Sequence, residues 1–233
     1  MKKFLIVLLT ALVIIGFLAS PIMNIRYVNV YGNNNLSTAS IINAIPEPTH
    51  IIAYSRRRAI EQILNTHPLV YRASITRDFI SREITIDITE RIVIAYVRFS
   101  EEQYLHIDIE GRVLTTSTYS GPSLPIVSGL YFTSFSLGEY LEIEEENLYI
   151  LATLATLLTT YNINSMIVEI QDISNIRMRY GNVSINLGNA QNLDEKIRVF
   201  IAALPYVSYF RNIGGILHIY DINSQWRLSF GEF

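Results

Sequence analysis

The stretch that decides the fold is REITIDITERIVIAYVRF, residues 82–99. Its first half alternates isoleucine with threonine or aspartate, and this period of two predicts a β-strand with one solvent-exposed face. After the charged pair Glu90-Arg91 the alternation stops, and residues 92–97 are apolar on both faces. Such a run predicts a strand that is buried from two sides. We therefore interpret Glu90 and Arg91 as the junction of two small domains.

Length and composition narrow the possible classes of protein. The chain has 233 residues, and half of them are hydrophobic, which is ample for packed cores. Its formal net charge of −3 gives no electrostatic signature of nucleic-acid binding, so that class is not expected. Cysteine is absent, so neither disulfides nor thiolate metal sites contribute to stability.

The first residues predict a membrane segment. Residues 4–23 carry no charged side chain, and as a helix they would just cross a hydrocarbon core of about 30 Å. Lysines precede the segment, so the positive-inside rule places residues 1–3 as a short cytoplasmic stub and the bulk of the chain on the periplasmic or extracellular side. The alternative is a cleaved secretory signal. Cleavage after Ala19 or Ser20 would place Phe17 or Leu18 third from the cut, where a small residue is preferred, so both sites are poor.

Residues 25–90 predict a small domain with the element order β-α-α-β-β. Ser37 and Ser55 are suitable N-caps for two short helices, over residues 38–45 and 56–65. One strand precedes these helices and two follow them. We expect a three-stranded sheet with both helices on one face.

Residues 91–233 predict a larger mixed β domain with two helices. Gly181-Asn182 has the form of a two-residue hairpin turn. The first helix follows acidic residues 142–146, which complement the helix dipole, and we expect the second helix to end at Pro205. The predicted fold class is therefore α+β: an N-terminal transmembrane helix, the small domain and then this larger domain.

Catalytic constellations are not evident in the sequence. Its four histidines are isolated from one another and from carboxylates at metal-ligand spacing. No nucleophile elbow, Walker loop or dinucleotide-binding motif follows a predicted strand. We expect no catalytic residue, no metal, no cofactor and no small-molecule substrate, and hence no enzyme. The histidines are His50, His67, His106 and His218.

A basic run, Arg56-Arg57-Arg58, begins the second predicted helix. It is interpreted either as a solvated helix face or as a contact with acidic lipid or a partner. The sequence leaves both interpretations open.

Several short motifs follow one another along the chain. They are IRYVNVYGNNNLSTASIINAI, then HPLVYRASITRDFISREITIDITERIVIAYV, DIEGRVL, LPIVSG and LGNAQNLDEKI. In this order they resemble the FtsQ/DivIB family of bacterial cell-division proteins, whose members carry a POTRA domain followed by a β domain. The matching positions are Pro68, Val70, Ala73, Ile75, Arg77, Glu90, Arg91, Ala95, Asp108, Gly111, Val113, Leu124, Pro125, Gly129, Gly188, Glu195 and Lys196.

The resemblance implies a particular organisation and role. Residues 25–90 would be the POTRA domain and residues 91–233 the FtsQ-type β domain. The protein would be a non-enzymatic scaffold of the divisome, held by a single span in the cytoplasmic (inner) membrane at the division septum. It would bind partners of the FtsB/DivIC and FtsL type outside the membrane and help to control septal peptidoglycan synthesis.

The end of the chain is the predicted partner-binding site. An unpaired sheet edge can accept an added strand, and the resemblance places partner binding at the last strand. Large aromatic side chains dominate binding hot spots, which favours Tyr220 and Trp226 as anchors, although both could instead cover the core of the domain. The candidate partner-binding residues are Tyr220, Asp221, Ile222, Asn223, Ser224 and Trp226.

Two other classes of protein stay open as alternatives. POTRA modules also occur in outer-membrane assembly and secretion factors. A membrane-anchored cell-wall hydrolase would need a metal constellation or a nucleophile with its base, and the sequence shows neither.

Overall fold

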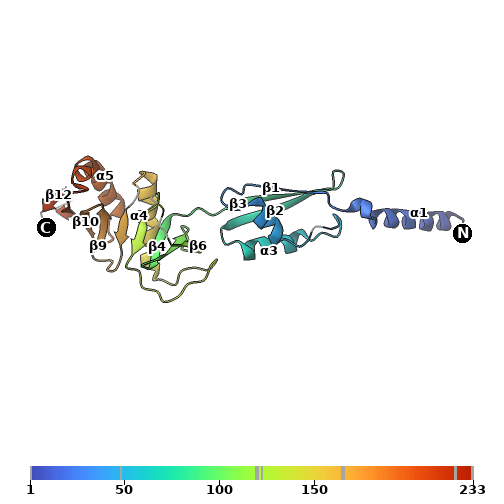
Figure 1. Cartoon of the computed structure of the whole chain (residues 1–233), viewed down its shortest axis with the longest axis horizontal. Helices are drawn as coiled ribbons and strands as arrows, with labels where there is room; N and C mark the ends of the chain where they lie inside the picture. The colour runs from blue at the N-terminus through green and yellow to red at the C-terminus, as the bar shows by residue number, and fades with distance from the viewer. Residues whose placement is uncertain are drawn as a thin grey trace. The chain divides into compact units, whose positions relative to one another are not determined.

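A computed structural model describes residues 2–47, 49–118, 121, 123–163, 166–222 and 225–231, with side chains other than those of residues 2 and 220–231. The chain divides after Arg91 into two compact units (Figure 1). Each unit has its own hydrophobic core, built from its own helices and strands.

The prediction of a transmembrane helix over residues 4–23 is wrong. The N-terminal helix α1 (Lys2–Leu18) has 17 residues, which is about 25 Å of helix and short of a hydrocarbon core of about 30 Å. It ends because Pro21 begins a separate 3₁₀ turn, η1 (Pro21–Met23). In the described part of the chain, no helix combines the length and the apolar character that crossing a membrane requires. The single span expected for the partners and the localisation is corrected with it.

The first unit has the predicted order of elements. They are β1 (Tyr27–Tyr31), α2 (Thr38–Ala44), α3 (Arg56–Thr66), β2 (Val70–Asp78) and β3 (Glu83–Glu90). The three-stranded sheet has the order β1-β3-β2, in which β3 pairs parallel with β1 and antiparallel with β2 (Figure 1). The last strand in sequence is therefore the central strand of the sheet.

Both helices begin at the serine N-caps that the sequence predicts. The Ser37 hydroxyl accepts a hydrogen bond from the backbone N–H of Ser40, and the Ser55 hydroxyl accepts one from Arg58. These caps satisfy N–H groups that have no partner within the helix. The alternating isoleucines of β3 then pack against the buried side chains of α2 and α3. The buried core contains Ile41, Ile45, Tyr54, Ala59, Ile63, Val70, Ile75, Ile84, Ile86 and Ile88.

The second unit is a long mixed sheet with two helices. Its elements are β4 (Ala95–Ser100), β5 (Gln103–Ile107), β6 (Val113–Ser117), β7 (Ile126–Ser128), α4 (Glu145–Thr160), β8 (Ile167–Glu169), β9 (Ile176–Tyr180), β10 (Val183–Gly188), α5 (Leu193–Phe210), β11 (Gly215–Ile222) and β12 (Gln225–Gly231). The nine strands are ordered β12-β11-β10-β9-β8-β7-β4-β5-β6. Two parallel pairs, β7 with β8 and β10 with β11, are connected by α4 and α5 respectively.

These helices contact each other and bury one face of the sheet (Figure 1). The buried faces of α4 and α5 carry Leu151, Leu154, Leu158 and Phe200, which belong to the same core as the inward-facing residues of β9 and β10. Burying one such side chain contributes about 1.5–3 kcal/mol. The opposite side of β9 is polar, because Arg177 alternates with buried residues.

Two predicted boundaries differ from the structure. The strand expected over residues 92–97 begins at Ala95, because residues 91–94 connect the two units without strand pairing. The second helix does not end at Pro205 but continues to Phe210, with Pro205 on its exposed side. Proline removes one helical N–H donor, but the buried Val207 and the partly buried Phe210 hold the final turns against the core.

The central strand of the first unit should be the most sensitive to truncation. Ile86 is 0% exposed on β3, so Ile86→Ala removes fully buried apolar surface and should lower the free energy of unfolding by about 2–5 kcal/mol. Ile80 is 96% exposed, and Ile80→Ala is the matched control with little expected effect. Urea unfolding followed by circular dichroism measures both changes; equal effects would contradict the assigned core.

Candidate functional site

Glu90 fastens the end of β3 to the loop that follows β1. Its carboxylate accepts hydrogen bonds from the backbone N–H groups of Asn35 and Leu36, at 3.0 Å each, and from the Asn35 side-chain amide at 2.8 Å. Partial burial alone would raise the pKa of Glu90. The hydrogen bonds from Leu36 and Asn35 outweigh this effect and hold the pKa below its ordinary value.

Arg91 also points back into the first unit. Its backbone N–H donates to the Leu69 carbonyl at 2.7 Å, and its guanidinium lies 5.1 Å from the ring centre of Tyr71. Both members of the charged pair therefore anchor the chain to the first unit at the residue where that unit ends. This is a structural role, because the contacts satisfy backbone groups of the first unit.

Other residues of the motifs have structural roles of the same kind. Arg77 donates to the carbonyls of Ile51, at 3.1 Å, and Tyr54, at 3.3 Å, and so closes the loop before α3. The buried Lys196 donates to the Asn189 carbonyl at 2.8 Å at the start of α5. Buried charged groups persist only when they are hydrogen-bonded. The motifs therefore mark backbone turns that specify the fold.

His106 and Ser117 form a histidine–serine contact between neighbouring strands. The Nε2 atom of His106 lies 2.7 Å from the hydroxyl oxygen of Ser117 on the neighbouring strand, and its ring packs edge-on against Tyr96. Burial lowers the pKa of His106, which favours the neutral ring. Among the described residues, no group of three or more His, Cys, Asp or Glu side chains could hold a metal ion.

The end of the chain forms an edge of the nine-stranded sheet. Strand β11 pairs parallel with β10, and β12 pairs antiparallel with β11 from Ile216↔Gly231 to Ile222↔Gln225. In the described part of the chain, β12 has a strand on one side only. Every second residue of an edge strand directs its backbone N–H and C=O outward, where another strand can pair with them.

Of the predicted partner-binding residues, only Trp226 belongs to the edge strand β12 in the described part of the chain. Tyr220, Asp221 and Ile222 belong to β11, and Trp226 in β12 is the register partner of Asp221. Asn223 and Ser224 lie outside the described residues, as do the side chains of Tyr220, Asp221, Ile222 and Trp226. Their role in binding stays a prediction, as does the alternative that the aromatic pair covers the core.

Arg211, the residue that follows α5, ties the end of this helix to the β9–β10 turn. The carbonyl of Arg211 accepts a hydrogen bond from the N–H of Asn182 in the β9–β10 turn, at 2.8 Å, and the guanidinium of Arg211 lies over the Tyr180 ring. Gly181 is required there, because a Cβ at its position would meet the Arg211 side chain at 2.5 Å. Strand β11 starts four residues after this anchor.

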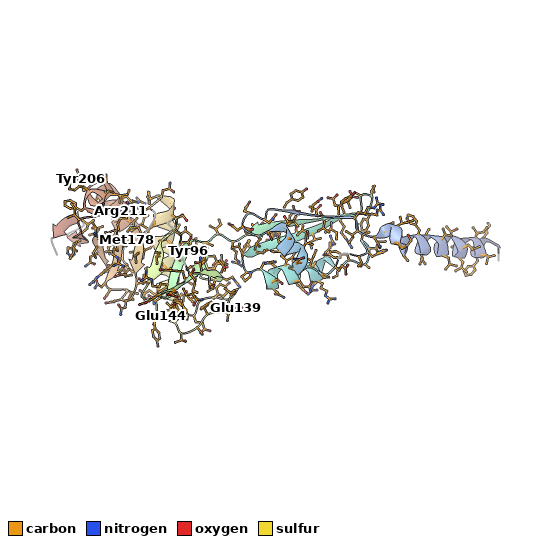
Figure 2. The ribbon with its side chains drawn as sticks, viewed as in Figure 1. Tyr96, Glu139, Glu144, Met178, Tyr206 and Arg211 are labelled. Atoms are coloured by element: carbon orange, nitrogen blue, oxygen red, sulfur yellow. The ribbon has the colours of Figure 1, made fainter. Side chains whose placement is uncertain are left out.

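Exposed tyrosines on the same helix were missed by the sequence analysis. Tyr206 and Tyr209 are 75% and 74% exposed, and Figure 2 shows Tyr206 at the outer surface of α5. They escaped notice because the helix was expected to end at Pro205. Their spacing of three residues on a continued helix would have been the signal.

The first unit matches a known domain family. The family described as "POTRA domain, FtsQ-type" matches residues 23–91, which include β1–β3 and both small helices. These residues are therefore similar to POTRA domains of the FtsQ type, and the first unit is called the POTRA domain below.

Similarity to whole proteins extends further along the chain. It is 28% identical over 201 residues to the cell division protein DivIB of Clostridium tetani, which covers 83% of this chain and 74% of that protein. It is 30% identical over 103 residues to the proteins of the same name from two Staphylococcus aureus strains, NCTC 8325 and MRSA252, but spans only 23% of their length. The predicted resemblance to the FtsQ/DivIB family is confirmed.

Replacement of Glu90 tests its role at the junction. Glu90→Gln loses a charged acceptor of several N–H donors and should lower the free energy of unfolding by about 1–2 kcal/mol near neutral pH. Because the folded-state pKa is lowered, this stabilisation is present above the ordinary value of 4.5 and is lost as the pH falls through the folded-state pKa. The difference from the unmodified chain should therefore shrink in acid.

Urea unfolding at about pH 7 and about pH 3 measures this difference. Asp87→Asn is the control, because Asp87 lies on the same strand with its side chain exposed. A Glu90→Gln variant that is as stable as the control at neutral pH would contradict the anchoring role.

Proposed function

We propose that this chain acts as a non-enzymatic scaffold at the division septum, where it binds partners of the FtsB/DivIC and FtsL type through the free edge of β12. The observation that carries the proposal is the position of β12 as a terminal strand of the sheet. The similarity to cell division protein DivIB supports a role in cell division. A contribution to the control of septal peptidoglycan synthesis follows from the same proposal.

Strand addition suits a protein that acts through surfaces. A partner strand beside β12 would pair with the outward N–H and C=O groups of residues 225–231, each hydrogen bond contributing about 0.5–1.5 kcal/mol net. Backbone pairing gives affinity, and side chains on the partner-facing edge give specificity. Trp226 on β12 and Tyr220 on the neighbouring strand β11 are proposed as the anchors.

A stable support under the edge strand limits the entropic cost of binding. Leu217 and Ile219 of β11 are buried in the core, and α5 covers β10 and β11. The edge is therefore held in its strand conformation before a partner arrives, which reduces the ordering required on association.

Proline substitutions test the outward backbone directly. In an antiparallel pair, adjacent residues direct their N–H groups to opposite sides, so one of Arg227 and Leu228 donates toward β11 and the other outward. Proline is tolerated on an edge strand where the N–H faces solvent. Of Arg227→Pro and Leu228→Pro, one should therefore keep a native circular dichroism spectrum and yet lose capture of the DivIC-type protein from the same organism.

The other proline variant is the control. It removes an N–H group that donates toward β11, so it breaks the β11–β12 pairing instead of the outward edge. Tyr220→Ala with Trp226→Ala should also weaken capture while the fold is retained. If every folded variant captured the DivIC-type protein as well as the unmodified chain does, the β12 site would be rejected.

A further inference from the structure

The outer surface of α4 and α5 is uncharged along most of its length. The two helices contact each other and lie over the same sheet (Figure 1). Residues 147–160 of α4 and residues 199–210 of α5 contain no charged side chain, and their outer surface is called the helical face below. A surface helix ordinarily presents charged residues to water, as α3 does with Arg57 and Glu61. The helical face therefore has the composition of a surface that is covered.

Aromatic side chains project from the helical face where charged ones are usual. Tyr149 on α4 is 67% exposed, and Tyr206 and Tyr209 on α5 are more exposed still. On α5 these tyrosines follow the exposed Ala202 at intervals of four and three residues, so the three side chains share one stripe of the helix. Removing such a stripe from water is favourable, which makes the helical face suitable for packing against another protein surface.

Charge is confined to the two ends of this pair of helices, and its sign differs between them. Both β8 and β10 pair antiparallel with β9, so the two crossover helices run in the same direction over the sheet. Glu145 and Glu146 lie in the first turn of α4, and Glu195 lies in the first turn of α5. The exposed Arg211 follows the last residue of α5. One end is therefore acidic and the other is basic.

We propose that the helical face packs against the helical face of a second copy of this chain in a two-fold symmetric dimer. A two-fold axis places a surface against itself, so that surface has to be complementary to itself. An uncharged face meets this condition at its centre, because no charge is buried without a partner. The free edge of β12 is not part of this face, so it stays available for the proposed function.

The charges at the ends of the helices select one of two symmetric arrangements. With the axis along the helices, α4 would face α5 of the second copy in the same direction, and the acidic ends would meet. With the axis across the helices, α5 faces α5 of the second copy in the opposite direction. Arg211 of each copy then lies at the end of the interface that holds Glu195 of the other copy, which gives two opposite-charge pairs. The antiparallel arrangement is therefore favoured.

Glu195 is the carboxylate of this end that faces outward. The neighbouring Asp194 forms an ion pair with Arg198 within its own helix, so its charge is already compensated. Glu195 is exposed to solvent. An antiparallel copy brings the opposite charge to both Glu195 and Arg211 at once, which a membrane surface or a helix of another protein has no reason to do. Anionic headgroups would also repel the acidic end.

The size of the helical face indicates a dimer that dissociates on dilution. Helices α4 and α5 have 16 and 18 residues, which makes them about 24 and 27 Å long. Two helices of about 10 Å diameter then cover about 500 Å² on each copy, or about 1,000 Å² in total. Specific interfaces begin near this total area, so we expect association at micromolar concentrations.

Sedimentation equilibrium of the 233-residue chain tests the dimer. The unmodified chain should be a monomer–dimer mixture at about 10–100 μM. Tyr206→Glu with Tyr209→Glu places charges inside the interface and should raise the dimer Kd by about tenfold or more. Tyr27→Glu with Tyr131→Glu adds the same charge at exposed tyrosines outside both helices and should leave the Kd unchanged. Every variant keeps α1, so association through its apolar surface would persist in all of them.

Charge reversal distinguishes a second copy from any other occupant. Arg211→Glu or Glu195→Arg alone would bring like charges together at both ends of the dimer, and each should raise the Kd about threefold. The combined variant restores opposite charges and should recover the Kd of the unmodified chain. Because Arg211 also lies over the Tyr180 ring, the melting temperature of each variant is measured alongside.

Cysteine cross-linking locates the interface independently of these variants. The chain contains no cysteine, and the exposed Ala202 lies near the middle of α5, where antiparallel copies bring the same residue of both chains close together. Ala202→Cys should give a disulfide-linked dimer under mild oxidation. Thr115→Cys, at an exposed position on β6, should not.

Three results would overturn the inference: a chain that stays monomeric throughout this concentration range, equal association by the folded Tyr206→Glu with Tyr209→Glu variant, or a folded charge-reversed variant that fails to recover the Kd. Binding to phosphatidylglycerol vesicles by a chain that stays monomeric would also overturn it, in favour of a membrane. The folded proline variant of β12 should dimerise normally, which separates this inference from the proposed function.

Discussion

Backbone N–H and C=O groups on the free side of an edge strand need hydrogen-bond partners, and the proposed mode of binding follows from this need. Water can satisfy these groups while the protein is alone, but a second strand satisfies them in a directional way. Among the strands that end a sheet in the described part of the chain, β2 lies in the POTRA domain and β12 in the second unit; β1 and β6 end the same two sheets on their other sides. Helices buttress the sheet behind both of them, so the edges are held ready for pairing.

The chain keeps these two edges on separately folded units. Glu90 and Arg91 tie the end of β3 to the POTRA domain through Asn35 and Leu69, and regular structure resumes only at Ala95. Each unit can therefore hold its own edge without depending on the packing of the other. In the proposed function, the protein joins other proteins by backbone pairing.

Much of the POTRA domain could be predicted because its signals are local. Ser37 and Ser55 start helices by capping, and the isoleucine alternation of β3 requires one buried face. The Gly181-Asn182 turn likewise joins β9 and β10 as expected. These features depend on neighbours in sequence, so one sequence is enough to find them.

The predictions that were wrong concern features that depend on long-range packing or on the length of a helix. Pro205 would end an isolated helix, but Val207 and Phe210 pack into the core and carry α5 beyond it. The apolar N-terminus predicted a membrane span by composition, whereas α1 stops at Leu18 before Pro21. The pairing order that leaves β2 at an edge was also beyond sequence analysis, because it is set by the contact of β1 with β3.

Residue-resolved hydrogen exchange of β12, in the free chain and with the DivIC-type protein of the same organism, tests the central claim most directly. The account predicts that alternate amides within residues 225–231 exchange rapidly in the free chain and slowly in the complex. Protection of these same amides in the free chain, or a complex that forms while they continue to exchange rapidly, would contradict it.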